Sequence, residues 1–255
     1  MPSSFDSEIS FIASQEIDVP DGDVSFDTGD ETSDLHDLTT QGAVVDSNLV
    51  VFPKDTPTSV RNAVCNWTLF AQRAATKKVD PQQTREWVDA YLDVLLQTGW
   101  SLREDASTWS EEQVVGSVVH QKILDLVAVA LGPVPTALAL VTAALTSLQA
   151  MNERSKWITL FDRRAKSATS TGFSVANVDP YADGSAQLRS IDFRVEARRT
   201  LTQFLFFRFT SEAALMFKRG VVLFISADAL NELGPSIERR VVAFARDNIA
   251  AFDID

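Results

Sequence analysis

The sequence contains very little of the chemistry from which most enzyme sites are built. It has one cysteine, Cys65, and two histidines, His36 and His120. A single cysteine excludes an internal disulfide, and three such side chains are too few for the usual structural zinc site. The HExxH, GxSxG, Walker and GxGxxG patterns are also absent from the sequence. We therefore expect a protein that is not an enzyme and that uses no cofactor and no metal.

Positive charge is nearly absent from the N-terminal quarter. Residues 1–55 hold 13 Asp and Glu and one basic residue, Lys54, which leaves 22 acids and 22 bases in the rest of the chain. Residues 1–47 are therefore interpreted as an acidic, partly disordered segment, or alternatively as a detachable pro-segment. A signal peptide needs a basic start, so none is expected. The protein is expected to be made in the cytoplasm and then released or stored.

Charge of either sign is absent from Leu126 to Leu148. A membrane-spanning helix needs roughly 20 apolar residues, so this stretch is long enough to raise the question of a membrane. Pro133 and Pro135 argue against one continuous helix, because proline removes a backbone donor and clashes with the preceding turn. We interpret the stretch as a hydrophobic hairpin of two helices, the first from about Ser110 and the second from Pro135.

The remaining elements follow from apolar spacing. Three-to-four spacing predicts helices over 58–74 and 81–99, and a last helix from Gly234. Alternation predicts strands at 9–13, 49–52, 100–110, 173–177, 188–196 and 201–209, with a further hairpin of 213–217 and 221–225.

The strand over 201–209 is apolar on both faces, so each face of its sheet needs a cover. This predicts a single three-layer α/β/α domain over 48–255, of the α/β (α+β) class, in which helix pairs cover a central antiparallel sheet on both faces. A helical bundle beside a separate β domain is the structural alternative.

Four segments together carry a resemblance to a known family. They are Lys122–Gly132, Leu140–Thr146, Asn152-Glu153 with Trp157, and Phe204–Phe207. In this order and spacing the chain, from about Asn48 to Leu233, resembles the Cyt-type cytolytic δ-endotoxins. Volvatoxin-like fungal cytolysins and an Erwinia virulence factor are related to that family in fold.

The resemblance implies one α/β/α domain that acts on lipid bilayers without enzymatic chemistry, in which helix layers move away from the sheet. It also implies a precursor that is trimmed at its termini, although the acidic segment does not itself match the family. The turn at Arg198-Arg199 and the basic C-terminal helix depart from the family pattern.

We therefore expect a pore-forming or membrane-disrupting cytolytic toxin of the insecticidal or virulence type. Its expected partners are the lipid bilayer of a target cell and further copies of itself, in a dimer or a higher oligomer. No nucleic acid is expected, because acids alternate with the bases of residues 153–166. The alternative is a non-toxic binding or structural protein on the same scaffold. The residues expected to contact the membrane are Leu126, Val127, Val129, Leu131, Leu138, Val141, Leu145, Leu148, Phe204, Leu205, Phe206, Phe207, Phe209, Leu223 and Phe224.

Overall fold

The computed structural model describes most of the chain. The described residues are 5–19, 41–81, 83–105, 110–114, 124–127, 135–150, 170–196, 214–252 and 254. The strand predicted over 201–209, the turn at Arg198-Arg199 and the helix end predicted beyond Ala150 lie outside them.

The described helices and strands are interspersed along the chain. The helices are α1 (Asp6–Ser14), α2 (Thr58–Lys78), α3 (Thr84–Gln97), α5 (Pro135–Ala150) and α7 (Ala227–Asn248), with a short helical segment at 124–127. The strands are β1 (Gly42–Val45), β2 (Asn48–Val51), β3 (Ser101–Asp105), β4 (Ser110–Val114), β5 (Ser170–Pro180), β6 (Ala186–Glu196), β7 (Ala214–Ile225) and β8 (Ile249–Phe252).

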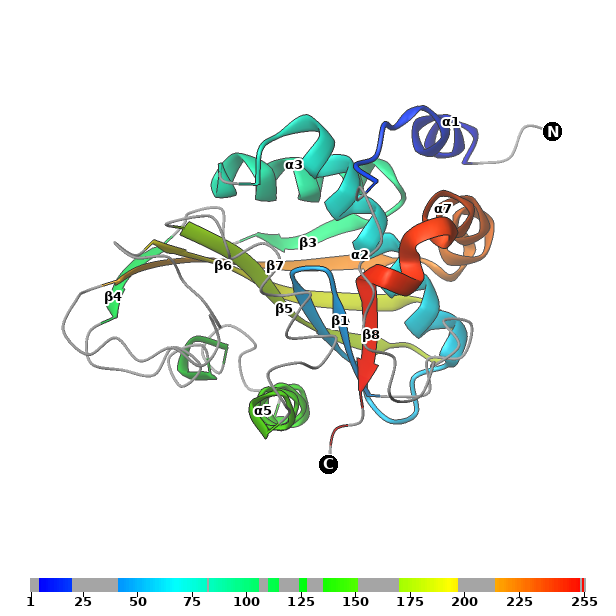
Figure 1. Ribbon diagram of the computed structural model, residues 1–255. Coiled ribbons are helices and arrows are strands. Elements are labelled where there is room, and N and C mark those ends of the chain that lie inside the picture. The colour runs from blue at the N-terminus through cyan, green and yellow to red at the C-terminus, as the bar shows by residue number, and fades with distance from the viewer. Residues whose placement is uncertain are drawn as a thin grey trace.

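The strands form one sheet between helical layers. The order is β3-β7-β6-β5-β2-β1-β8, and β4 pairs with β7 beside β3. In Figure 1, α2, α3 and α7 lie on one side of the sheet and α5 lies on the other. The predicted three-layer α/β/α architecture of the α+β class is confirmed.

The sheet is mixed, which corrects the prediction of a purely antiparallel one. β2 and β5 pair in parallel, with Leu49 opposite Val175, whereas the other described pairs are antiparallel. The chain leaves β2 through α2 and returns to β5 only after α5, and such a long crossover permits parallel pairing.

The main core lies between the sheet and the layer of α2, α3 and α7. Trp67 and Phe70 of α2 are fully buried there, and Trp67 meets Trp100 edge to face at 6.4 Å between ring centroids. The Trp67 indole N–H donates to Thr98 Oγ1 at 2.9 Å, so the one polar atom of this ring has a partner. The helices predicted over 58–74 and 81–99 are α2 and α3, and their apolar sides form this core.

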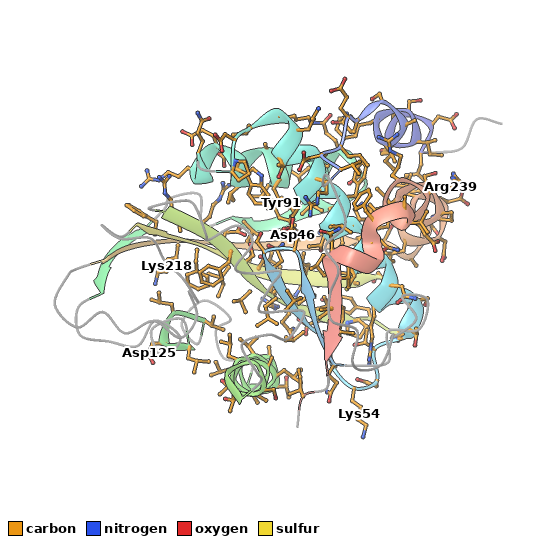
Figure 2. The ribbon with its side chains drawn as sticks, in the orientation of Figure 1. Asp46, Lys54, Tyr91, Asp125, Lys218 and Arg239 are labelled. Carbon is orange, nitrogen blue, oxygen red and sulfur yellow. The ribbon has the colours of Figure 1, made fainter. Side chains whose placement is uncertain are left out.

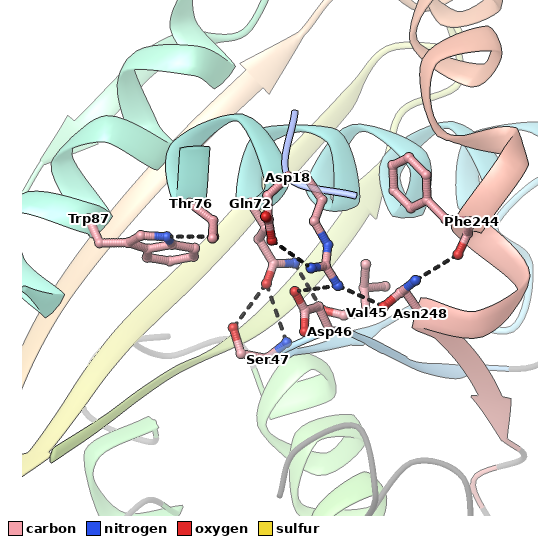
Figure 3. Close-up of polar contacts among 10 residues, drawn as sticks. Asp18, Val45, Asp46, Ser47, Gln72, Thr76, Trp87, Phe244 and Asn248 are labelled. Atoms are coloured by element: carbon pink, nitrogen blue, oxygen red, sulfur yellow. Dashed lines mark hydrogen bonds and ion pairs between the residues drawn. The ribbon is translucent and has the colours of Figure 1, made fainter. Parts of the chain in front are cut away.

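A buried polar network fixes the β1–β2 turn beneath α2 (Figure 3). Arg73 Nη2 lies 3.2 Å from Asp46 Oδ2 and donates to Asn248 Oδ1 at 2.6 Å, and Arg73 Nη1 lies 3.4 Å from Asp18 Oδ2. Gln72 accepts from Ser47 Oγ at 2.9 Å and donates to the Val45 carbonyl at 2.9 Å. These contacts join the N-terminal segment, the turn, α2 and the end of α7.

Parts of the N-terminal segment pack against this body. The strand predicted at 9–13 is the helix α1, because Phe5, Ile9 and Ile12 follow helical spacing and pack on the core. Strand β1 also lies before the predicted boundary at Asn48, so the sheet begins at Gly42. The predicted division into 1–47 and 48–255 stays a prediction.

Three other elements differ from the sequence prediction because of pairing between distant strands. Ser110–Val114 is a strand on β7 and not the start of a helix. Residues 214–225 form no hairpin around Lys218-Arg219-Gly220, since all three residues pair with β6 within one long strand. Ile249–Phe252 pairs with β1 and does not extend the last helix.

Helix α7 begins earlier than predicted, at Ala227. Ser226 is its cap, with Oγ accepting from the Ala229 N–H at 3.1 Å. Pro235 lies inside the helix, and its side chain is exposed, so the missing donor lies on the solvent side.

Candidate functional site

The second face of the sheet is apolar and separate from the main core. Along β5 and β6 the side chains alternate, so that Ala176 and Leu188 face the main core while their neighbours face α5. Phe173 and Phe193 are opposite each other on this second face, and their rings stack at 4.9 Å between centroids. The buried apolar residues of the sheet that lie outside the main core on this side are Val44, Leu49, Val51, Phe173, Val175, Ile191, Phe193 and Ala250.

Helix α5 covers this face with small and branched side chains. Its buried residues are Ala137, Val141, Ala144 and Leu145, and it contacts β5 and β2. Their spacing of three and four puts them on one stripe of the helix. The two alanines in this stripe allow the helix to approach the sheet closely.

Helix α5 has no charged side chain, and two of its hydroxyl groups bond to the helix itself. Thr142 Oγ1 donates to the Leu138 carbonyl at 2.8 Å, and Thr146 Oγ1 donates to the Thr142 carbonyl at 2.8 Å. Because these donors are already satisfied, moving them out of water costs less than moving a free hydroxyl.

The segment 124–127 lies on the same side of the sheet as α5. Leu126 and Val127 are buried, whereas Asp125 is exposed and points away from the sheet in Figure 2. The predicted hydrophobic hairpin is therefore described in two pieces, and residues 128–134 between them lie outside the described residues.

The fifteen residues expected to contact membrane fall into three groups. Leu126, Val127, Leu138, Val141 and Leu145 belong to the α5 side, and Leu148 lies in α5 at a position whose side chain is not described. Val129, Leu131, Phe204, Leu205, Phe206, Phe207 and Phe209 lie outside the described residues.

The two predicted residues of β7 lie on opposite faces. Leu223 is fully buried in the main core beneath α2, α3 and α7. Phe224 is half-buried on the other face, where its ring lies 6.2 Å from Tyr181 and 4.6 Å from the Arg103 guanidinium. Only Phe224 of this pair is on the α5 side.

Sequence reasoning did not assign a role to Val44, Leu49, Val51, Phe173 or Val175, which form the floor beneath α5. The alternation of strands 173–177 and 188–196 contained the signal, since one face of each strand is apolar. Which helix covers which face depends on the crossover from β2 to β5, and no local pattern encodes that crossover.

One buried carboxyl group lies on the opposite face, between the sheet and α3. Asp192 is almost completely buried, and burial raises its pKa to about 6, although a hydrogen bond from Ser174 and the charge of Arg219 act in the opposite direction. Asp192 in turn contributes to raising the pKa of Tyr91, whose main cause is burial. Asp192 is a single acid without a second carboxylate beside it among the described contacts, so the site does not form an acid–base pair.

The other candidates for chemistry have no reactive environment. Burial raises the pKa of the Cys65 thiol to about 12, so this side chain packs as a thiol and is a poor nucleophile. Among the described residues, no three His, Cys, Asp or Glu side chains gather closely enough to hold a metal ion. Within the same residues, no helix combines the length and hydropathy that crossing a membrane requires.

The comparisons with known proteins give distant similarities in structure alone. No family model and no curated protein matches the chain. The Evf virulence factor is similar with a TM-score of 0.36 and 10% identity, over 82% of this chain and 83% of that one. A delta-endotoxin has a TM-score of 0.36 and 14% identity, over 75% and 91% of the two chains.

The activated Cyt2Ba monomer from Bacillus thuringiensis subsp. israelensis is also similar, with a TM-score of 0.28 and 15% identity, over 54% of this chain and 79% of that one. At these TM-scores and identities the similarities establish neither the family nor the activity of this chain.

Proposed function

We propose that this protein is a cytolytic toxin that acts on lipid bilayers by forming pores or disrupting the membrane, without enzymatic chemistry. The observation that carries the proposal is α5. This helix has no charged residue, the hydroxyls of Thr142 and Thr146 bond to its own backbone, and it covers an apolar face of the sheet. Such a helix is stable against the sheet in water, and entering lipid costs it little.

The length of α5 restricts how it enters the bilayer. Its 16 residues span about 24 Å at 1.5 Å per residue, which is less than the ~30 Å hydrocarbon core. In this proposal α5 therefore enters together with the apolar segment that precedes it, as a helical hairpin, or lies within the interface.

Departure of α5 would leave the sheet face with Phe173 and Phe193 exposed. Exposed apolar patches of this kind associate with lipid or with another copy of the protein. Self-association on the membrane, as a dimer or a higher oligomer, is therefore part of the proposal. So are release or storage of the protein before it acts, and its activation by trimming of the terminal segments.

The test is dye leakage from lipid vesicles made with and without phosphatidylserine. The intact chain is compared with a chain trimmed to begin at Gln41, just before β1. Leakage from either form supports the proposal. No leakage from both forms over a wide concentration range overturns it and favours a non-toxic binding or structural protein.

A substitution pair tests the role of α5 directly. Ala139 on the outer side of α5 is exposed, so Ala139→Asp leaves the folded protein intact in water. A charge at the centre of a membrane helix costs about 2.5–3.5 kcal/mol, so the leakage rate is expected to fall by about 50-fold or more. Leu96→Asp is the matched control, because Leu96 is an exposed apolar residue of α3. Equal leakage by both variants would exclude entry of α5 into lipid.

A further inference from the structure

Helix α1 covers part of the helical layer on the other side of the molecule. It lies against α7 in Figure 1. Ile12 is fully buried in the main core, and Phe5, Ile9, Phe11 and Ile17 pack against it. No strand of the sheet belongs to residues 5–19, so α1 can leave without breaking a strand pair.

Three cations of α2 and α7 hold this segment in place. Arg240 donates to the carbonyl of Gln15 and, at 3.4 Å, to that of Ala13. The Lys78 ammonium lies 5.4 Å from the centre of the Phe11 ring. Arg73 Nη1 lies 3.4 Å from the Asp18 carboxylate.

The charges of the two surfaces are complementary. Residues 5–19 carry Asp6, Glu8, Glu16 and Asp18 and no base. The surface beneath them presents Arg240 and Lys78, each preceded in sequence by another exposed base, Arg239 and Lys77. In Figure 2 Arg239 extends from α7, where its side chain is exposed. An acidic apolar helix thus covers an apolar surface with a basic rim.

We propose that this surface of α2 and α7 is a second lipid-contacting surface, which binds an anionic bilayer once α1 has left it. An anionic membrane offers the same two features as α1, an apolar phase and a layer of negative charge. Basic residues near such a membrane attract it, and the attraction falls within a Debye length. Helix α1 and the anionic lipid therefore compete for one surface. The inference rests on the proposed membrane activity and adds to it a lipid class and a place of contact.

The test measures binding to vesicles separately from leakage. Ile12→Asp places a charge in the core contact of α1 and is expected to release the helix, which hydrogen exchange of the α1 amides would show. Val19→Asp is the matched control, since Val19 is 56% exposed and the substitution adds the same charge. Vesicles of phosphatidylcholine with phosphatidylserine are compared with vesicles of phosphatidylcholine alone.

We expect Ile12→Asp to bind the phosphatidylserine vesicles about tenfold more tightly than the wild type at low salt, and Val19→Asp to bind like the wild type. The gain should disappear on phosphatidylcholine alone, in roughly 0.5 M salt, where screening is short-ranged, and in the triple variant I12D/K78E/R240E. A released α1 without tighter binding overturns the inference, as does a triple variant that still binds. Tighter binding without leakage leaves the inference standing and overturns the proposed toxin function.

Discussion

At the scale of single residues, the least ordinary group is the Asp192 carboxyl. It lies on β6 beneath α3, and Ser174 of β5 donates a hydrogen bond to one of its oxygens. The other oxygen has no hydrogen-bond partner in the described part of the structure. The charge of Arg219 on β7 acts on Asp192, and Arg219 also pairs with Asp89 of α3. Asp192 in turn acts on the pKa of Tyr91 of α3. Ionisation of Asp192 therefore destabilises the folded protein at the contact between α3 and the sheet.

The pKa of Asp192 predicts how stability depends on pH. The folded protein holds this proton up to about pH 6, whereas the unfolded chain releases it near the ordinary value of 3.8. Between these values the folded state binds more protons, so the contribution of Asp192 to the free energy of unfolding is full below pH 3.8 and is lost as pH rises to about 6. Above pH 6 the contribution stays constant.

Asp192→Asn should therefore stabilise the protein at neutral pH. The raised pKa already includes the attraction to Arg219, and two pKa units correspond to a gain of at most about 3 kcal/mol. Urea unfolding at pH 5 and pH 7.5 measures both values. The gain should be larger at pH 7.5, and a variant that is less stable than the wild type at pH 7.5 would contradict the assignment.

At the scale of elements, the contact between the end of α3 and α7 depends on a glycine. Gly99 has φ +101°, and a Cβ there would lie 2.8 Å from Leu233 Cδ1. Gly234 is next to this leucine but has an ordinary environment, with Trp67 3.9 Å from the place of a Cβ. The two positions therefore form a natural pair for comparison.

Gly99→Ala should destabilise the protein by about 2 kcal/mol or more, because strain at positive φ adds to the contact with Leu233. Gly234→Ala should change the free energy of unfolding by less than about 1 kcal/mol, since the helix propensity of alanine is offset by the following proline. Chemical denaturation of both variants measures the difference. Similar values for the two would mean that α3 does not end as described.

Elements with strong local patterns could be predicted, and elements defined by distant partners could not. The stripe of Val60, Val64 and Trp67 predicted α2, and Gly99 marked the end of α3. By contrast, Lys218-Arg219-Gly220 has the composition of a turn, yet it continues β7 because Phe193, Asp192 and Ile191 of β6 lie opposite. Cross-strand partners decide such cases, and a single sequence does not reveal them.

At the scale of the whole molecule, the two faces of the sheet are covered by different sets of described elements. One face carries α2, α3 and α7, whose side chains form the main core. In the described residues, the other face carries α5 and the segment 124–127. Helix α5 of this layer has no charged residue. Within the described residues, the part proposed to enter lipid therefore lies in the layer that has fewer elements.

Native-state hydrogen exchange should therefore distinguish the two layers. The amides of α5 should exchange through an opening that costs less free energy than the opening of α2, by about 2 kcal/mol or more. Low concentrations of denaturant separate local opening from global unfolding for both helices. If α5 exchanged only through global unfolding, the layer could not leave the sheet while the rest stays folded.

The candidate site was only partly predictable for a related reason. The absence of charge from Leu126 to Leu148 is visible in the sequence and marks the unusual layer directly. The floor beneath it is assembled from two strand pairs, β1–β2 and β5–β6, and these pairs are far apart in sequence. The covering helix could therefore be found, whereas the surface it covers could not.

The place of β1 and β2 limits which proteases could convert the protein into a shorter, folded form. Lys54 is the first basic residue, and it lies just after β2 (Figure 2). A trypsin-like enzyme cutting there would remove α1 together with both strands, so that β8 would lose its partner β1 and β5 would keep only β6 as a partner. Removing α1 while keeping the sheet requires a cut between α1 and β1 by an enzyme that recognises acidic, aromatic or small residues. A trypsin-like enzyme therefore finds no lysine or arginine between α1 and β1, where trimming would leave the sheet intact.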